Sequence, residues 1–280
     1  MNTQTKAPFL RRRLGRRLKA LREEAGLTIE QAAPLLDKTR SALGRIERGE
    51  TRADVHFVRS CMDLYDQYVD DLLAETREAL KPQWFRSYGV EDLGYVDVET
   101  HAATVKEFPA LNLPGLLQTE SYIRAVLAGG RRRTKVQMDN DIAVRLIRQR
   151  RLTGDSSPLD LVAVVDEAAL RREVGGAEVM REQLRHLVEA AAWPTVSLQV
   201  LPLREGVHSA MDGAFILLSF PEPEDSELLY VEYATGALHI EDSEEVRRAR
   251  LKFDQLRTEA LSPADSVALI EQIIFERYGP

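Results

Sequence analysis

A dense run of helix-capping residues near the N-terminus constrains this chain more than any other feature. Gly26 follows a helical run and suits the left-handed residue that ends a helix, because glycine has no Cβ. Thr28 and Gln31 have the spacing of a capping box, so a second helix is predicted to begin directly after Thr28. Thr39 can cap a third helix that runs to about Arg48. The segment therefore predicts two short helices that cross at a tight corner.

The third helix is predicted to have an inner and an outer face. The inner sides of helices two and three carry small or apolar residues: Ala33, Leu36, Leu43 and Ile46. The outer face carries arginine and serine, which can donate hydrogen bonds to base edges in a DNA major groove. A solvated charged face on an ordinary helical hairpin is the alternative. With the corner included, the predicted DNA-binding residues are Lys38, Thr39, Arg40, Ser41, Gly44, Arg45 and Arg48.

The same segment resembles the XRE or Cro/C1-type helix-turn-helix transcriptional regulators over roughly residues 10–75. The matching residues are Leu21-Arg22, Gly26-Leu27-Thr28, Thr39, Arg45-Ile46-Glu47 and Gly49. The resemblance implies a partly buried ion pair between Arg22 and Glu47. The chain departs from the family pattern at Ile29, Pro34 and Gly44, and these departures lower the DNA affinity that the resemblance implies.

Charge is divided unevenly along the chain. Residues 1–60 hold 14 Lys+Arg against 7 Asp+Glu, whereas the remaining residues hold 24 against 38, so a basic head precedes an acidic body. A basic head suits the phosphate backbone of double-stranded DNA, and Arg16 and Arg17 are predicted phosphate contacts. The acidic body would repel DNA and favour a basic partner. A disordered tail is the alternative for the arginine cluster over residues 11–13.

Cysteine content and hydropathy exclude several classes of protein. The single cysteine, Cys61, has no partner for an internal disulfide and is predicted to be a core residue. No apolar run approaches the length of a membrane span, and no apolar segment near the N-terminus indicates a signal peptide. We therefore expect a cytoplasmic protein without membrane contact. A homodimer is also expected, because one recognition helix reads only a few base pairs.

The predicted fold class is α+β, with two domains. Residues 1–81 are expected to form an all-α, five-helix head with a linking helix, and Lys81-Pro82 is the predicted boundary. Residues 82–280 are expected to form an α/β effector or partner-binding domain with a mixed sheet of about five strands. The predicted strands are Thr104–Phe108, Leu159–Val165, Val196–Leu201, Ala214–Phe220, Leu228–Tyr233 and Ala237–Ile240. The predicted helices are Glu120–Ala128, Asp139–Leu152, Ala177–Ala191, Ser243–Glu259 and Pro263–Tyr278.

The second domain also resembles a known family. The matching segments are Pro114–Glu120 with Tyr122 and Ala125, Arg145 with Arg148-Gln149, Asp166–Arg171, Gln183-Leu184 and Val200–Pro202. They are similar to a domain of unknown function that follows XRE heads in actinobacterial regulators, some of them Scr-type antitoxin-like and some WhiJ-like. The resemblance implies a transcriptional regulator that is often encoded beside a small protein it binds. It implies no reaction.

A functional and a structural interpretation compete for the charged residues of the second domain. Glu167 follows a predicted strand, and Glu99, Arg148 and His208-Ser209 could surround it for acid–base work or anion binding. An ion-pair network that holds the Leu-Leu-Gln segment to the sheet is favoured over catalysis. The arginines of helix 139–152, at positions 145, 148, 150 and 151, are expected to form a mostly solvated face. No catalytic residue, metal site or cofactor is predicted.

Two binding functions remain open for this domain. One is an interaction module for a small partner protein, and the other is a sensor of a small apolar metabolite. The residues that would line the sensor pocket are aromatic, although core packing is the favoured alternative for them: Trp84, Phe85, Tyr88, Tyr95, Phe108 and Tyr122. The candidate partner or ligand site comprises Leu117, Gln118, Tyr122, Arg148 and Glu167.

Overall fold

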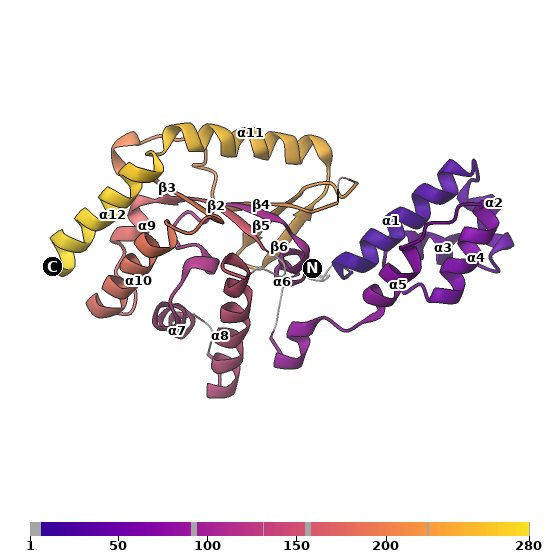
Figure 1. The fold of residues 1–280 in the computed structure, drawn as a ribbon, viewed down its shortest axis with the longest axis horizontal. Helices are drawn as coiled ribbons and strands as arrows, with labels where there is room; N and C mark the ends of the chain where they lie inside the picture. The colour runs from indigo at the N-terminus through magenta and orange to yellow at the C-terminus, as the bar shows by residue number, and fades with distance from the viewer. Residues whose placement is uncertain (1–6, 91–93, 131, 155–157, 223, 280) are drawn as a thin grey trace. The chain divides into compact units, whose positions relative to one another are not determined.

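The computed structural model describes residues 7–90, 94–130, 132–154, 158–222 and 224–279 (Figure 1). The chain divides into two compact units. The first comprises Met1–Trp84 with Val96–Val98, and the second comprises Phe85–Tyr95 with Glu99–Pro280. Across the described ranges, no helix combines the length and the apolar character that crossing a membrane requires.

The first unit contains the predicted five-helix head. Its helices are α1 (Phe9–Glu24), α2 (Ile29–Leu35), α3 (Arg40–Glu47), α4 (Val55–Tyr65) and α5 (Leu72–Leu80). The capping box is present: the Thr28 hydroxyl accepts from the Gln31 backbone N–H at 3.3 Å, and the Gln31 side chain accepts from the Thr28 N–H at 2.8 Å. Thr39 caps α3 in the same way, accepting from Ala42 N at 3.1 Å. Local hydrogen bonds therefore define both helices of the corner.

Helix α1 packs directly on the end of α3. A Cβ on Gly15 would lie 2.5 Å from the carbonyl oxygen of Glu47, so this contact between the two backbones requires glycine. Gly49 has φ +70°, and its Cβ would lie 2.7 Å from the Arg12 backbone. The four predicted inner residues are buried with Leu14, Leu18 and Cys61 in one apolar core: Ala33, Leu36, Leu43 and Ile46. The head therefore holds α3 in a fixed orientation.

The second unit is built on one six-stranded mixed sheet, which confirms the α+β class, and each of the six predicted strands overlaps an observed one. Its strands are β1 (Thr104–Phe108), β2 (Asp160–Asp166), β3 (Val196–Leu201), β4 (Phe215–Ser219), β5 (Leu228–Tyr233) and β6 (Gly236–Ile240). They are ordered β3-β2-β1-β4-β5-β6. The pairs β1–β2 and β2–β3 are parallel and the other three pairs are antiparallel, so β1 joins a parallel half to an antiparallel half.

Helices cover both faces of this sheet (Figure 1). The helices after α5 are α6 (Tyr95–His101), α7 (Glu120–Gly129), α8 (Lys135–Gln149), α9 (Glu167–Arg171), α10 (Ala177–Ala190), α11 (Ser243–Glu259) and α12 (Pro263–Tyr278). Helix α11 lies on one face, where Phe253 packs with Phe108 and Phe215. Helices α7, α8 and α10 lie on the other face. A sheet covered on both sides requires the nearly continuous apolar sequence seen in β2.

Three local predictions for the second unit were wrong. Helix α8 begins at Lys135 instead of Asp139, because Thr134 and Gln137 form a second capping box. Helices α6 and α9 were not predicted, because each is too short to show a helical repeat. The arginines of α8 do not form a solvated face: Arg145 and Arg148 bind groups inside the unit.

Candidate nucleic-acid interface and buried polar network

The outer surface of α3 presents four long or polar side chains to solvent. Arg40, Ser41, Arg45 and Arg48 are exposed on this helix. The corner residues Lys38 and Thr39 are exposed beside them. The helix therefore carries a row of hydrogen-bond donors on the side opposite Leu43 and Ile46.

Gly44 was predicted to lie on this surface, but it is buried. A Cβ there would lie 3.2 Å from Arg48 Nη1 and 3.5 Å from Ile29 Cδ1. Gly44 and Ile29 lie in a hollow of about 660 Å³ lined by Lys19, Arg22, Glu23, Gly26, Leu27, Thr28, Ile29, Gly44, Glu47 and Arg48. Ile29 and Gly44, which both depart from the family pattern, therefore lie next to each other.

Two of the α3 arginines carry an acidic companion. Arg40 Nε donates to Glu30 of α2, and Arg48 Nε donates to Glu50 at 2.7 Å. The pKa of Glu30 is lowered, first by its own backbone N–H and then by the bond from Arg40. The hydrogen bond from Arg48 likewise lowers the pKa of Glu50. Among the described residues Arg45 has no ion-pair partner, so it is the α3 guanidinium most available to an external anion.

Arg22 and Glu47 form a buried ion pair inside the head. Arg22 Nε lies 2.7 Å from Glu47 Oε1 and Nη2 lies 3.0 Å from Oε2, with side chains only 6% and 5% exposed. Arg22 Nη1 also donates to the Leu27 carbonyl at 2.8 Å. The hydrogen bond to Glu47 raises the pKa of Arg22. The pair ties α1 to the end of α3, and the Leu27 bond ties both to the turn before α2.

The predicted phosphate contacts on α1 lie in different surroundings. Arg17 forms ion pairs with Glu75 and Asp71 of α5, and Arg13 lies 3.5 Å from the same Glu75 carboxylate. Arg16 is half-buried. Arg17 therefore already links α1 to α5, and a phosphate would have to replace two carboxylates there.

The second unit holds a buried polar network under α8. Arg148 binds Glu99 through two hydrogen bonds, Nε to Oε1 at 2.7 Å and Nη2 to Oε2 at 2.5 Å, and the side chains are 11% and 1% exposed. The Arg148 guanidinium also lies 5.2 Å from the centre of the Tyr95 ring. Arg151 donates to the carbonyls of Glu99 and Ala102 just before β1. This network fixes the entry to β1.

The same network holds the Leu-Leu-Gln segment. Arg145 Nη1 donates to the Gln118 side chain at 2.7 Å, and Gln118 donates to the Leu113 carbonyl at 2.8 Å. Gln149 donates to the carbonyl of Gln118 at 2.7 Å, and Gln183 of α10 donates to that of Leu117 at 2.7 Å. Of the predicted site, Leu117, Gln118 and Tyr122 are buried in this packing. Phe85 and Phe108, proposed for a sensor pocket, are buried as well.

Glu167 belongs to a different part of the unit. It follows the C-terminal end of β2, where it accepts from Arg171 Nε at 2.6 Å and from the Leu203 backbone N–H at 2.9 Å. Glu99 precedes β1, and β1 runs parallel to β2. The two carboxylates therefore lie at opposite ends of the parallel strands. Ser209 instead binds Glu259, so the imagined constellation around Glu167 is not assembled.

In the second unit, the buried carboxylate of Glu107 was not predicted from the sequence. Glu107 of β1 is 5% exposed, and its Oε1 has no hydrogen-bond partner among the described residues. Burial first, and then the Glu99 carboxylate, raise the pKa of Glu107 to about 8, although Arg148 opposes the shift. The Lys106-Glu107 pair does not indicate this burial, because charged residues in a five-residue strand normally indicate a solvated face.

Comparison with known protein families matches both units. Residues 93–272 match a domain of unknown function, DUF5753, and residues 13–76 match a helix-turn-helix domain. Neither the curated proteins nor the solved structures yielded a match.

Proposed function

The chain belongs to the family of the DUF5753 domain of unknown function, and from that membership and its helix-turn-helix domain we propose a sequence-specific transcriptional regulator that binds a double-stranded DNA operator. The exposed row of donors on α3 is the observation that carries the proposal. A helix held rigidly by its own head can enter a major groove with little loss of conformational entropy.

Each α3 side chain has a distinct proposed part. Arg45 has no ion-pair partner among the described residues and is the first choice for a bidentate contact to guanine. Arg40 and Arg48 would exchange Glu30 and Glu50 for DNA groups. Ser41, Thr39 and the corner Lys38 add shorter contacts, and Arg16 and Arg17 remain proposed phosphate contacts. Gly44, being buried, would leave room for DNA to approach without contributing a side chain.

Residues 82–280 are proposed to form a regulatory module that has no catalytic role. In this proposal the protein resembles the XRE-headed, antitoxin-like regulators of actinobacteria, acts in the cytoplasm as a homodimer, and binds a small protein encoded next to it. The excess of 38 acidic over 24 basic residues after position 60 supports a basic partner. The buried contacts of Leu117, Gln118 and Arg148 support a structural role for the candidate site.

The DNA-binding part is tested by selecting operators from a random duplex library with the full chain. Fluorescence anisotropy then compares wild type with Arg45→Ala on the selected duplex. We expect Arg45→Ala to cost about 1–3 kcal/mol and to relax selectivity at one position, as loss of a base contact does. Arg77→Ala is the matched control, because Arg77 is an exposed arginine of α5. No enrichment of any sequence would contradict the proposal.

The regulatory part is tested by adding the product of any small neighbouring gene to the same titration. A shift in operator affinity supports the partner module. A ligand-dependent rise in melting temperature without any effect of the small protein would instead favour a metabolite sensor.

A further inference from the structure

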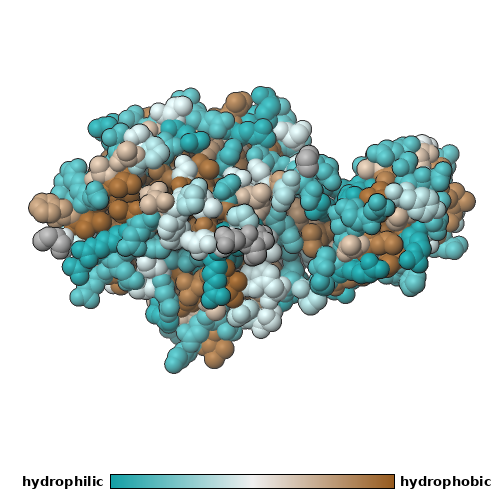
Figure 2. Space-filling view, in the orientation of Figure 1, coloured by the Kyte–Doolittle hydropathy of each residue, from teal (hydrophilic) through white to brown (hydrophobic). Residues whose placement is uncertain are grey.

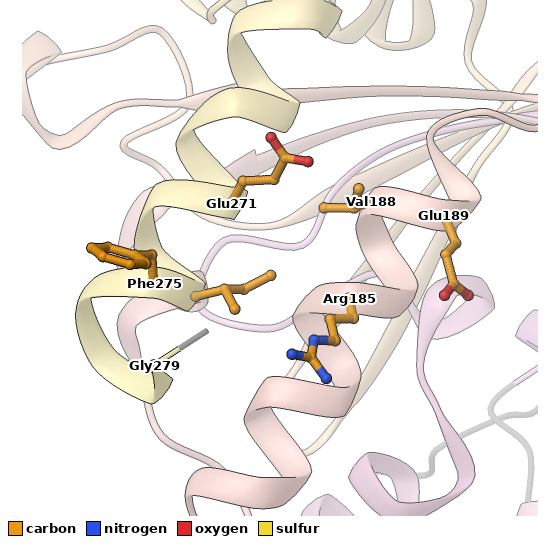
Figure 3. A pocket seen from close by; sticks show the side chains of 7 residues that line it. Arg185, Val188, Glu189, Glu271, Phe275 and Gly279 are labelled. Carbon is orange, nitrogen blue, oxygen red and sulfur yellow. The ribbon is translucent and has the colours of Figure 1, made fainter.

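A hollow between α10 and α12 opens next to an exposed phenylalanine (Figure 3). Phe275 is 70% exposed on α12, an unusual state for so large an apolar side chain. The hollow has a volume of about 400 Å³, and its apolar lining comes from Val188, Ile274 and Phe275. In Figure 3 the Phe275 ring projects from the side of α12 away from α10. Figure 2 shows hydrophobic surface over this end of the second unit.

Charged side chains surround the hollow without neutralising one another. Arg185 and Glu189 come from α10, and Glu271 comes from α12. Within the part of the chain that the structure describes, none of the three forms an ion pair. By contrast, Glu276, five residues beyond Glu271, pairs with Arg171 at 3.7 Å. The surface formed by α10 and α12 therefore carries a protruding apolar side chain, Phe275, an apolar hollow, and charges of both signs.

This combination fits a second copy of the same chain better than a partner of one charge. A two-fold axis places each residue i opposite residue j of the other copy, so a surface that carries both a cation and an anion can satisfy itself. A patch for a basic partner would carry carboxylates without Arg185 among them. A patch that excludes its own copy would carry a single sign of charge.

We infer that the α10–α12 surface is the homodimer contact of this protein. The Phe275 ring of each copy enters the hollow beside Val188 of the other, and Arg185 faces Glu271 of the other copy. An aromatic anchor in an apolar pocket with ion pairs at its rim is typical of the residues that dominate interface affinity. The inference rests on the homodimer in the proposed function and assigns it a surface.

Sedimentation velocity on the full chain, over a range of micromolar concentrations, tests the surface. Phe275→Glu is expected to raise the dimer dissociation constant by at least about 30-fold, as loss of a central anchor does. Val136→Glu is the matched control, since Val136 is equally exposed, at 68%, on α8. Thermal melts check the folding of both variants, and both are expected to fold because each change is at a solvent-exposed side chain.

A charge-reversal pair tests the predicted partners. Arg185→Glu and Glu271→Arg should each weaken the dimer, and the two together should restore it, because the reversed pair attracts again. A wild type that stays monomeric while binding its operator would overturn the inference and leave the proposed function standing. A dimer dissociation constant that is unchanged by Phe275→Glu, Arg185→Glu and Glu271→Arg would also overturn the inference. So would a Phe275→Glu variant that still dimerises but no longer binds the small protein. A dimer that responds as expected but binds no DNA would contradict the proposed function and leave the inference intact.

Discussion

The arginines of α3 and those of α8 differ in how far their ion pairs are exposed to solvent. Arg40 and its companion Glu30 are 71% and 57% exposed, whereas Arg148 and Glu99 are 11% and 1% exposed. Water and salt compete for the first pair, and nothing competes for the second. An exposed pair contributes at most about 1 kcal/mol and can be exchanged for another anion. A buried pair is not exchanged in this way, because breaking it leaves an unpaired charge that solvent does not reach.

The largest predicted effect on the free energy of unfolding comes from replacing Arg148. Arg148→Ala should lower the free energy of unfolding of the second unit by about 3–5 kcal/mol, because it leaves Glu99 buried without a partner. Urea denaturation monitored by tryptophan fluorescence measures it. Arg150→Ala, at an exposed arginine two residues away, should change stability by less than about 0.5 kcal/mol. Equal effects of the two changes would show that α8 has a solvated arginine face after all.

The head contains its own buried pair, with a slightly smaller expected effect. Arg22→Ala should cost about 3 kcal/mol, because Glu47 would remain 6% exposed without a counter-charge. Thermal and urea unfolding of the full chain, followed by circular dichroism, measure the loss.

A double variant separates the ion pair from packing. Arg22→Met with Glu47→Leu should recover most of the stability, since replacing both charges removes the unpaired carboxylate. A double variant no more stable than Arg22→Ala would indicate that the arginine acts through its other contact, the Leu27 carbonyl.

A third prediction concerns pH and the Glu107 carboxyl beside the Arg148–Glu99 pair. Its pKa is raised to about 8 in the folded chain by burial, so the folded state binds a proton that the unfolded state releases near its ordinary value. Its stabilising contribution is therefore complete at low pH and is lost as pH rises toward 8. Between pH 6 and pH 8 wild type should lose about 1–2 kcal/mol more than Glu107→Gln. Parallel pH profiles for the two proteins would refute the raised pKa.

The smallest effect on stability is expected at the exposed pair. Arg40→Ala should change the free energy of unfolding by less than about 0.5 kcal/mol, because its pair with Glu30 is solvated. On the selected operator the same variant should lose about 1–3 kcal/mol of binding free energy. Chemical denaturation and anisotropy on one preparation measure both. A large loss of stability without a loss of binding would reverse the roles assigned to the two regions.

Much of the fold could be predicted because its signals are local. The Thr28–Gln31 capping box, Ser262-Pro263 and the apolar run of β2 each act within a few residues, and the helices and strands they predict lie within a few residues of the observed ones. Burial that depends on distant residues could not be read in this way. Gly44 is covered by Ile29 of another helix, and Glu99 finds its partner 49 residues away.

The buried carboxylate of β1 shows the same limit. Glu107 lies in a strand flanked on both sides, by β2 and β4, and its neighbours Glu99 and Arg148 come from α6 and α8. None of these contacts has a signature in the sequence Thr-Val-Lys-Glu-Phe. The burial of Glu107 therefore could not be predicted from the residues next to it in the sequence.

The most direct test of the central claim is a salt-dependent anisotropy titration of the wild-type protein against its selected operator and a scrambled duplex of equal length. We expect tighter binding to the operator than to the scrambled duplex at every salt concentration. We also expect the affinity to fall by orders of magnitude between about 50 and 200 mM salt, because phosphate contacts release counterions. Equal binding to both duplexes, or an affinity that does not change with salt, would contradict the assignment of α3 as a DNA-reading helix.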